Sequence, residues 1–528
     1  MRLASRPVTR RSFIGLMSVA GLGLASIGCS TAPTSTPAKS TPAKPVVVGI
    51  LAEPNTLDPF IVALDTPSSQ VMGNVYEALL DQDFAKRATV PMLAEKWEQR
   101  GPTTWAFKLR EGVQFHKDYG ELTADDVVFN VELTINEKKP RLQAWSSAKG
   151  AKAVSKYEVE IYLQNPDMPF LLSAVTPSFG YIASKRAIQE MGFERFQRNP
   201  VGTGPFQFER WTTGSEIVLK RFAKYRESGL PKVDEIVFRP SADLLVRRAQ
   251  LERGELDFVD QVDFKDVPAL QSSTSIKLSS STGWNWDYIS FNLKSPNAPW
   301  TKKEVRQAIA YAINREAIAK EVTLYAGQAT PTDDPLPPGF MAYKDGPWKY
   351  PYAGDVETAK RLMQQAGHGS GFTIACITSN KPSLRREMEM VADQLKAIGV
   401  KMDLQGLDLA TFNAKAKAHE LQMALEDINV TSPDSDRALY QFFHPTGPQN
   451  HGYENKQVAD KLDQARVESD NAKREVLYQS ITQQAVEDAS YIFTEHVNLV
   501  RAMNAKLAGF PGSPQEGKLF FRTLQWEA

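Results

Sequence analysis

LREGVQFHKDYGELTADDVVF, residues 109–129, joins a predicted strand to a predicted helix through a short loop. The strand covers residues 103–110, where apolar and polar side chains alternate. Thr123 and Asp126 have the spacing of a capping box, with Asp in place of the usual Glu, and predict where the helix starts. Phe115 and Val127 are expected in the core. A strand followed at once by a helix indicates an α/β protein.

The rest of the chain repeats this mixture of strands and helices. A second capping-box pattern, Thr301-Lys-Lys-Glu304, precedes apolar residues at helical spacing, and Asp355 is expected to cap a further helix. Further strands are predicted at residues 46–51, 157–163, 288–293 and 400–404. The predicted fold class is therefore α/β with mixed sheets, and 528 residues are enough for two or three lobes.

The composition excludes several function classes. Lys plus Arg and Asp plus Glu both number 62, without the clustered basic charge of a nucleic-acid-binding protein. The two cysteines, Cys29 and Cys376, provide no zinc motif, and Cys376 in an apolar run is expected to be a buried thiol. No nucleophile elbow, P-loop, HExxH or GxGxxG motif is present. We expect no cofactor, no metal and no enzyme activity, although distant carboxylates could still assemble a catalytic pair.

The first 45 residues are typical of an export and anchoring segment. Residues 1–29 combine a basic start with a short apolar stretch, and Thr9–Ile14 resembles a twin-arginine signal. Ser26-Ile27-Gly28-Cys29 resembles a lipobox, with Ser26 in place of the usual apolar residue, so Cys29 is the predicted lipidation site. A plain cleaved signal is the alternative. Residues 30–45 contain only small residues, Pro, Thr and Lys, and are expected to form a tether.

Five segments in chain order resemble the peptide/nickel-type family of solute-binding proteins, which serve ABC importers. Residues 202–204 lie in its glycine-rich turn, where Gly202 and Gly204 are expected to supply positive φ. The resemblance runs from about residue 46 to the C-terminus. The matching segments are residues 52–59, 75–80, 109–129, 199–206, and 291–293 with 305–315.

The resemblance implies a two-lobed periplasmic-binding-protein clamshell of class II type. Lobe 1 would comprise residues 46–283 and 495–528 with an inserted subdomain, and lobe 2 residues 284–494. The expected partners are a small ligand, most simply a peptide, the permease subunits of an ABC transporter, and a membrane reached through the lipid anchor. The protein would be a monomer in the periplasm or at the cell surface. Sugars, opines and metal chelates are alternative ligands, and a sensor or enzyme that uses the same fold is an alternative function.

The resemblance also implies ligand contacts. Arg385 matches the arginine that binds a peptide carboxylate, with Arg386 beside it, and Asp434 matches the aspartate that binds the α-ammonium group. Around Asp434 the sequence departs from the family pattern, because Ser432 replaces a second aspartate and the usual tryptophan is missing.

Trp284, Asn285 and Trp286 are further candidates for the cleft lining. Strand alternation places both tryptophans on one face, and puts Asn285 and Asp287 on the other. For the two tryptophans, lining of the cleft and packing in the core are alternative roles. For Asp434, capping of a helix near Arg437 is the alternative to ligand binding.

Overall fold

The computed structural model describes residues 44–60, 66–83, 88–177, 179–322, 328–430 and 434–527. The predictions for the signal, for Cys29 and for the tether up to residue 43 lie outside these residues. From Ala43 onward the chain forms one compact unit. Among the described helices, none is long and apolar enough to cross a membrane.

Twelve strands in the described part of the chain join into one sheet, which has two sections that share β18 (Tyr491–Asn504). Val46, Val48 and Ile50 are buried on one face of β1 and Val47 is half-buried on the other, which explains why the strand lies inside the sheet. The first section contains β8 (Phe206–Thr212), β9 (Glu216–Arg221), β10 (Glu235–Pro240), β1 (Val46–Ile50), β11 (Phe258–Val259) and β12 (Ile276–Thr282). The second section contains β13 (Asn285–Phe291), β14 (Ala329–Pro331), β15 (Phe372–Ser379), β16 (Val400–Leu407) and β17 (Met423–Asn429).

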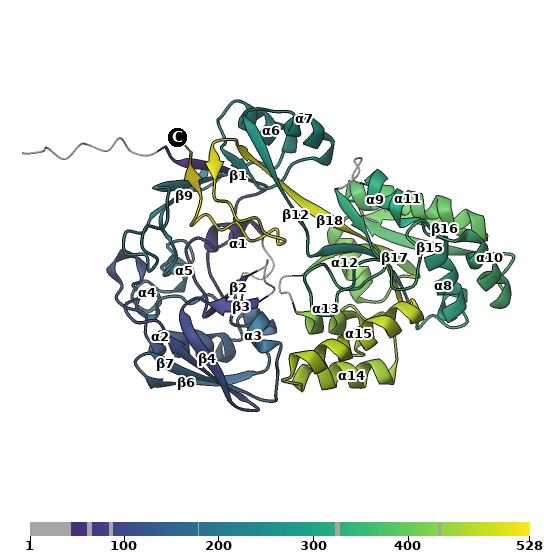
Figure 1. Cartoon of the computed structure of the whole chain (residues 1–528), viewed down its shortest axis with the longest axis horizontal. Coiled ribbons are helices and arrows are strands. Elements are labelled where there is room, and N and C mark those ends of the chain that lie inside the picture. The colour runs from purple at the N-terminus through teal and green to yellow at the C-terminus, as the bar shows by residue number, and fades with distance from the viewer. Residues whose placement is uncertain are drawn as a thin grey trace, which may run out of the picture. The chain divides into compact units, whose positions relative to one another are not determined.

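β18 changes partner in its middle. Its carboxyl-terminal half pairs antiparallel with β12, and its amino-terminal half pairs with β13 (Figure 1). Gly283 lies between β12 and β13, where a Cβ atom would come within 2.6 Å of the Val497 carbonyl oxygen, so only glycine fits. The change of pairing lies beside the boundaries predicted at 283/284 and 494/495, and the division into lobes at those residues stays a prediction.

The first section carries smaller sheets and the helices of the first half of the chain. Its large core includes Trp145, Phe107 and Val127. The smaller sheets are β4 (Ala94–Gly101), β5 (Thr104–Leu109), β7 (Glu158–Leu163) and β6 (Ala148–Ser155); β2 (Leu80–Asp83) with β3 (Ala88–Pro91); and β19 (Leu507–Ala508) with β20 (Gln525–Trp526). The helices are α1 (Thr66–Met72), α2 (Ala124–Asn136), α3 (Phe170–Ser173), α4 (Lys185–Met191), α5 (Phe193–Phe196), α6 (Leu244–Glu252) and α7 (Val267–Gln271).

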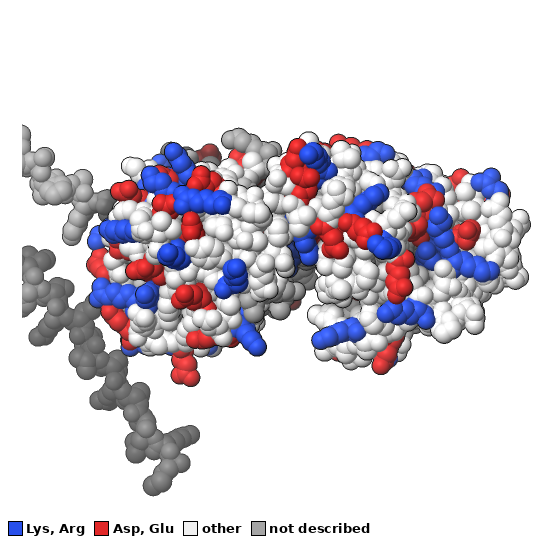
Figure 2. Space-filling model, turned by 90° about the horizontal axis from the view of Figure 1, so that it is seen from below, with Lys and Arg blue, Asp and Glu red and all other residues white. Residues whose placement is uncertain are grey.

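The second section has a separate apolar core on each face, and β13 contributes to both. Ile289 and Phe291 belong to the core under α8, α10 and α11, whereas Trp286 and Tyr288 belong to the core under α13, α14 and α15. The helices are α8 (Lys303–Ala312), α9 (Arg315–Val322), α10 (Val356–Gln365), α11 (Pro382–Leu395), α12 (Leu409–Lys417), α13 (Ser435–Phe443), α14 (Lys456–Val467) and α15 (Asn471–Asp488). Basic and acidic side chains are intermixed on the face that Figure 2 presents.

Several predicted elements lie within one or two residues of their predicted bounds, including β1, β5, β7 and α2. In contrast, β13 begins at Asn285, before the predicted 288, and β16 ends at Leu407, after the predicted 404. The Thr123–Asp126 capping box forms, because the Thr123 amide donates to Asp126 Oδ2 at 3.0 Å. The second capping-box prediction is wrong. Thr301 Oγ1 donates to the Ala298 carbonyl in a short 3₁₀ turn, and α8 begins only at Lys303. The Thr301 hydroxyl is hydrogen-bonded within the turn that precedes the helix, so it does not cap the helix. Cys376 is buried, as expected.

The prediction of positive φ at Gly202 and Gly204 is wrong, and close backbone approach explains these glycines instead. Neither residue has φ in the left-handed region. A Cβ atom on Gly202 would lie 2.2 Å from the Val75 carbonyl oxygen, and one on Gly204 would lie 2.7 Å from it. His116 fastens the same turn, since its Nε2 lies 2.9 Å from the Gly204 carbonyl oxygen and its Nδ1 3.4 Å from the Gly202 amide. The family motifs around residues 75, 116 and 202 are therefore one packed unit.

We expect Gly202→Ala to lower the free energy of unfolding by about 1–3 kcal/mol, because the methyl group overpacks a backbone contact. Gly150→Ala is the matched control, since a Cβ atom at Gly150 meets no atom within 4 Å. Urea denaturation followed by circular dichroism measures both variants. Equal stability of the two variants would contradict the close-approach explanation.

Burial lowers the pKa of His116 to about 4. The neutral imidazole is favoured in the folded state, so stability is present above the unfolded pKa of about 6.5 and is lost as pH falls towards about 4. His116→Gln removes this titration. Between pH 6.5 and 4, the free energy of unfolding of the variant should therefore decrease by less than that of the wild type, by on the order of 3 kcal/mol. Urea titrations across this range measure the difference, and parallel pH profiles would refute it.

Candidate ligand-binding site

A cavity of about 560 Å³ lies between the two sections of the sheet. Side chains from both sections form its wall, so it is built from segments far apart in the sequence. Its polar lining from the first section includes Gln70, Asp260, Asp263, Lys265, Asn498, Arg501 and Glu516, and from the second section Asn285, Asp287, Lys381, Ser383, Arg386, Asp427 and Asn429.

Strand alternation in β13 places Asn285 and Asp287 on the cavity side. The Val497 amide donates to Asn285 Oδ1 at 3.1 Å, which fixes this side chain against β18. Asp287 is buried, and burial raises its pKa to about 7. The sequence prediction that these two residues share one face of the strand is confirmed.

The amino-terminal end of α11 forms another part of the wall. Lys381 precedes Pro382, which starts the helix because proline lacks the amide that the first turn leaves unbonded. Lys381 Nζ donates to Asp427 Oδ2 at 2.7 Å, which links α11 to the end of β17. Arg386 follows one turn later and also lines the cavity. The helix thus presents positive charge to the cavity at its first turns.

On the opposite wall a buried polar network supports the lining. Asp260 pairs with Arg247 and accepts from Gln70 Nε2 at 3.0 Å. Arg501 is 1% exposed and donates to the Ser513 and Gln515 carbonyl oxygens, while its Nε has no hydrogen-bond partner among the described residues. Burial raises the pKa of Asp260 and lowers that of Arg501 to about 10. These groups present both signs of charge at fixed positions.

The wall therefore suits a ligand that carries both signs of charge. Its acidic residues are Asp260, Asp263, Asp287, Asp427 and Glu516, and its basic residues are Lys265, Lys381, Arg386 and Arg501. A cavity of this volume is in the usual range for small-molecule sites, about 300–1,000 Å³.

Of the predicted site residues, some line the cavity and others do not. Asn285 lines the cavity. Arg385 is exposed and is not among the described lining residues, whereas its neighbour Arg386 is. Trp284 and Trp286 are 5% and 0% exposed and pack in the aromatic core with Phe340, Phe442 and Phe493.

Asp434 lies at the start of α13, where it caps the helix by accepting from the Asp436 amide at 2.9 Å. Arg474 Nη2 lies 3.8 Å from the same oxygen, Asp434 Oδ1. The ligand roles of Asp434 and Arg385 stay predictions.

Sequence reasoning missed Asp260, Lys381, Asp427 and Arg501. Two local signals existed: Asp427 lies two residues after the apolar residues 423–425 of a strand, and Lys381 directly precedes a helix-starting proline. Neither signal indicates that Lys381 and Asp427 form an ion pair, because this contact depends on the parallel pairing of β15 with β17.

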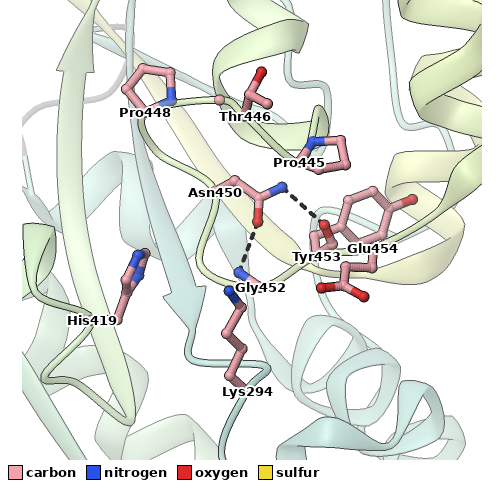
Figure 3. Close-up of a pocket in the computed structure, with 10 residues that line it drawn as sticks. Lys294, His419, Pro445, Thr446, Pro448, Asn450, Gly452, Tyr453 and Glu454 are labelled. Carbon is pink, nitrogen blue, oxygen red and sulfur yellow. Dashed lines mark hydrogen bonds between the residues drawn. The ribbon is translucent and has the colours of Figure 1, made fainter.

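A second, polar pocket of about 280 Å³ lies wholly within the second section (Figure 3). The Gly452 amide donates to Asn450 Oδ1 at 2.8 Å, and Asn450 Nδ2 donates to the Tyr453 carbonyl at 3.0 Å. Lys294 and His419 line it, and His419 Nδ1 lies 3.1 Å from Nδ1 of His451. Its wall comes from one section only, so ligand binding there would not join the two sections.

The model of the bacterial extracellular solute-binding proteins, family 5, middle region, matches residues 88–450. This chain belongs to that family. The match covers more than half of the chain and includes the glycine-rich turn and most of the cavity wall that the second section provides. The predicted family and the two-lobed α/β fold are confirmed.

Individual family 5 proteins are similar over most of the chain. The glutathione-binding protein GsiB of Shigella boydii is 30% identical over 492 residues, 90% of this chain and 93% of the relative. The structure of HbpA2 from Haemophilus parasuis has a TM-score of 0.82 at 26% identity, covering 92% of this chain and 100% of that one. AgaA from A. tumefaciens R10, solved with agropinic acid, has a TM-score of 0.74 at 26% identity and covers 92% and 99%. These relatives are solute-binding proteins.

We expect Asp434→Ala to lower the free energy of unfolding by about 1–2 kcal/mol, because it removes the cap of α13. Asp434→Asn should keep most of that stability, since an asparagine side chain also caps helices. Urea denaturation of both variants measures this. If Asp434→Ala is as stable as the wild type, the capping role is wrong.

Proposed function

We propose that this family 5 protein is an exported lipoprotein that captures a small peptide-like ligand between its lobes and delivers it to the permease of an ABC importer. One observation carries the proposal: the cavity wall presents fixed charges of both signs, contributed by both sections of the sheet. A peptide-like molecule has an ammonium group and at least one carboxylate, so its charges match that wall.

Each class of lining residue has a corresponding ligand group. Arg386 and Lys381 would bind a carboxylate, and the guanidinium of Arg386 can do so through two parallel hydrogen bonds. Asp287 and Asp427 would accept hydrogen bonds from an ammonium group. Asn285 offers both a donor and an acceptor to an amide of the ligand. The remaining apolar lining, including Phe264 and Val500, would cover carbon atoms.

Ligand binding would favour the closed form. A molecule that contacts Asp260 or Arg501 on one side and Asp287 or Arg386 on the other gains both sets of contacts only when the two walls are close. The closed form would then be the one that the permease recognises. The lipid on Cys29 would hold the protein at the membrane where that permease lies.

The relatives favour a peptide-like ligand and leave its identity to experiment. One relative is named as a glutathione-binding protein, and a more distant structure contains agropinic acid. Glutathione is a tripeptide with one ammonium group and two carboxylates, which fits a wall that offers both signs of charge. Glutathione is therefore the first ligand to test.

The first experiment is native mass spectrometry of protein purified without refolding, followed by calorimetric titration with glutathione, dipeptides and agropinic acid. We expect a co-purified or titratable peptide-like ligand. Arg386→Ala should weaken its binding by about 2–4 kcal/mol, because an arginine paired with a carboxylate in the cavity is lost. Protein without a bound mass that binds none of the probes would contradict a peptide-like ligand.

Arg385→Ala is the matched control, because Arg385 lies next to Arg386 on α11 but is not among the described lining residues. Unchanged affinity in Arg385→Ala, together with weak binding in Arg386→Ala, assigns the carboxylate contact to Arg386. The reverse result would return that role to Arg385, as the family resemblance implies, and would reject Arg386.

A further inference from the structure

Three carboxylates meet behind the cavity wall, each from a different element. Asp287 comes from β13, Glu387 from α11 and Glu495 from β18, and one oxygen atom from each lies within 4.8 Å of the others. Asp287 and Glu495 are directly opposite each other in the antiparallel pairing of β13 with β18. Like charges at opposed positions of a sheet destabilise it unless something compensates them.

Glu387 and Glu495 are fully buried, and the Thr494 hydroxyl beside Glu387 donates to the Asp287 carbonyl oxygen at 2.9 Å. Both side chains are 0% exposed, and none of their four carboxylate oxygens has a hydrogen-bond partner among the described residues. A buried polar acceptor without a donor is costly, and more so when the group is charged. Unpartnered carboxylate oxygens gathered in one buried place indicate that a positively charged species belongs there.

Burial raises the pKa of Asp287 and Glu495, and Lys381 lowers the pKa of both from a distance but forms no ion pair with either. Lys381 Nζ lies 2.7 Å from Asp427 Oδ2, so it is already paired at the cavity surface. Among the described residues, no ion pair to Asp287, Glu387 or Glu495 forms within 4.0 Å. Shared protons are the other way to reduce the repulsion, since burial and the neighbouring carboxylates raise the pKa of both glutamates.

We propose that Asp287, Glu387 and Glu495 bind a hard divalent cation, with Ca²⁺ as the best fit. The donors are all carboxylate oxygens, which hard cations prefer, and three carboxylates offer up to six of them. Ca²⁺ takes about six to eight oxygen ligands in flexible geometry, whereas Mg²⁺ usually keeps several waters, so a buried set of carboxylates favours Ca²⁺. Asp287 also lines the ligand cavity, which gives the ion a route of entry.

Such an ion would join the two strands at the sheet crossing to α11. Glu387 follows Arg386 directly, and Lys381 lies at the start of the same helix, so the ion would fix the part of α11 that forms the cavity wall. Only Asp287 is shared with the ligand cavity, because Glu387 and Glu495 are not among its described lining residues. Cation binding can therefore be measured without knowing the organic ligand.

The test is direct metal binding by the full exported chain. Protein treated with EDTA and then desalted is dialysed against CaCl₂, MgCl₂ or MnCl₂, and bound metal is measured by inductively coupled plasma mass spectrometry. We expect one equivalent of Ca²⁺ and a saturable rise in Tm, both reversed by EDTA. Glu387→Gln keeps the side-chain shape and should weaken Ca²⁺ binding by at least about tenfold, since a metal ligand is lost. Glu389→Gln, an exposed neighbour on α11, is the matched control and should bind as the wild type does.

Three results would overturn the proposal. The first is wild-type protein with no bound divalent metal and the same Tm in EDTA and in millimolar Ca²⁺, which would assign shared protons to the cluster. The second is Ca²⁺ bound equally by wild type and Glu387→Gln, which would place the ion elsewhere. The third is an equal loss of Ca²⁺ binding in Glu387→Gln and Glu389→Gln, which would show that the loss is a nonspecific effect of surface charge. Failure of any peptide-like ligand to bind would leave these results unaffected.

Discussion

The structure depends on one strand, β18, that is shared by two sections of a sheet. Its carboxyl-terminal half completes the first section by pairing with β12, and its amino-terminal half pairs with β13 in the second. Backbone hydrogen bonds therefore run continuously through the crossing, which limits how far the two sections can move apart. The cavity lies at this crossing, where residues from both sections form its wall.

The alternation of side chains along β13 divides core from site. One face of the strand carries Trp284, Trp286 and Tyr288, which pack with the aromatic side chains of the second section. The other face carries Asn285 and Asp287, which meet the cavity. The tryptophans thus hold the strand in register, and a one-residue slip would put indole rings into the cavity and carboxylates into the core.

Charge around the cavity is arranged in two layers. The inner surface offers groups of both signs, among which Lys381 and Asp427 form an ion pair. Behind it, the cluster of Asp287, Glu387 and Glu495 concentrates negative charge in a buried space. Asp287 belongs to both layers. The electrostatics of ligand capture and of the cluster are therefore coupled through this residue, and through α11, which carries Arg386 towards the cavity and Glu387 towards the cluster.

The sequence by itself determined the family, the α/β class, the positions of several elements and the two faces of β13, because these follow from local periodicity, capping and motif spacing. Capping at Thr123 and the alternation at residues 284–287 are examples. It did not determine that Gly202 contacts Val75, that Lys381 meets Asp427, or that Arg386 lines the cavity where Arg385 does not. Those facts depend on contacts between segments distant in the chain. Tertiary structure alone decided them, since sheet pairing and helix packing, which local pattern does not encode, set which of two adjacent side chains points inward.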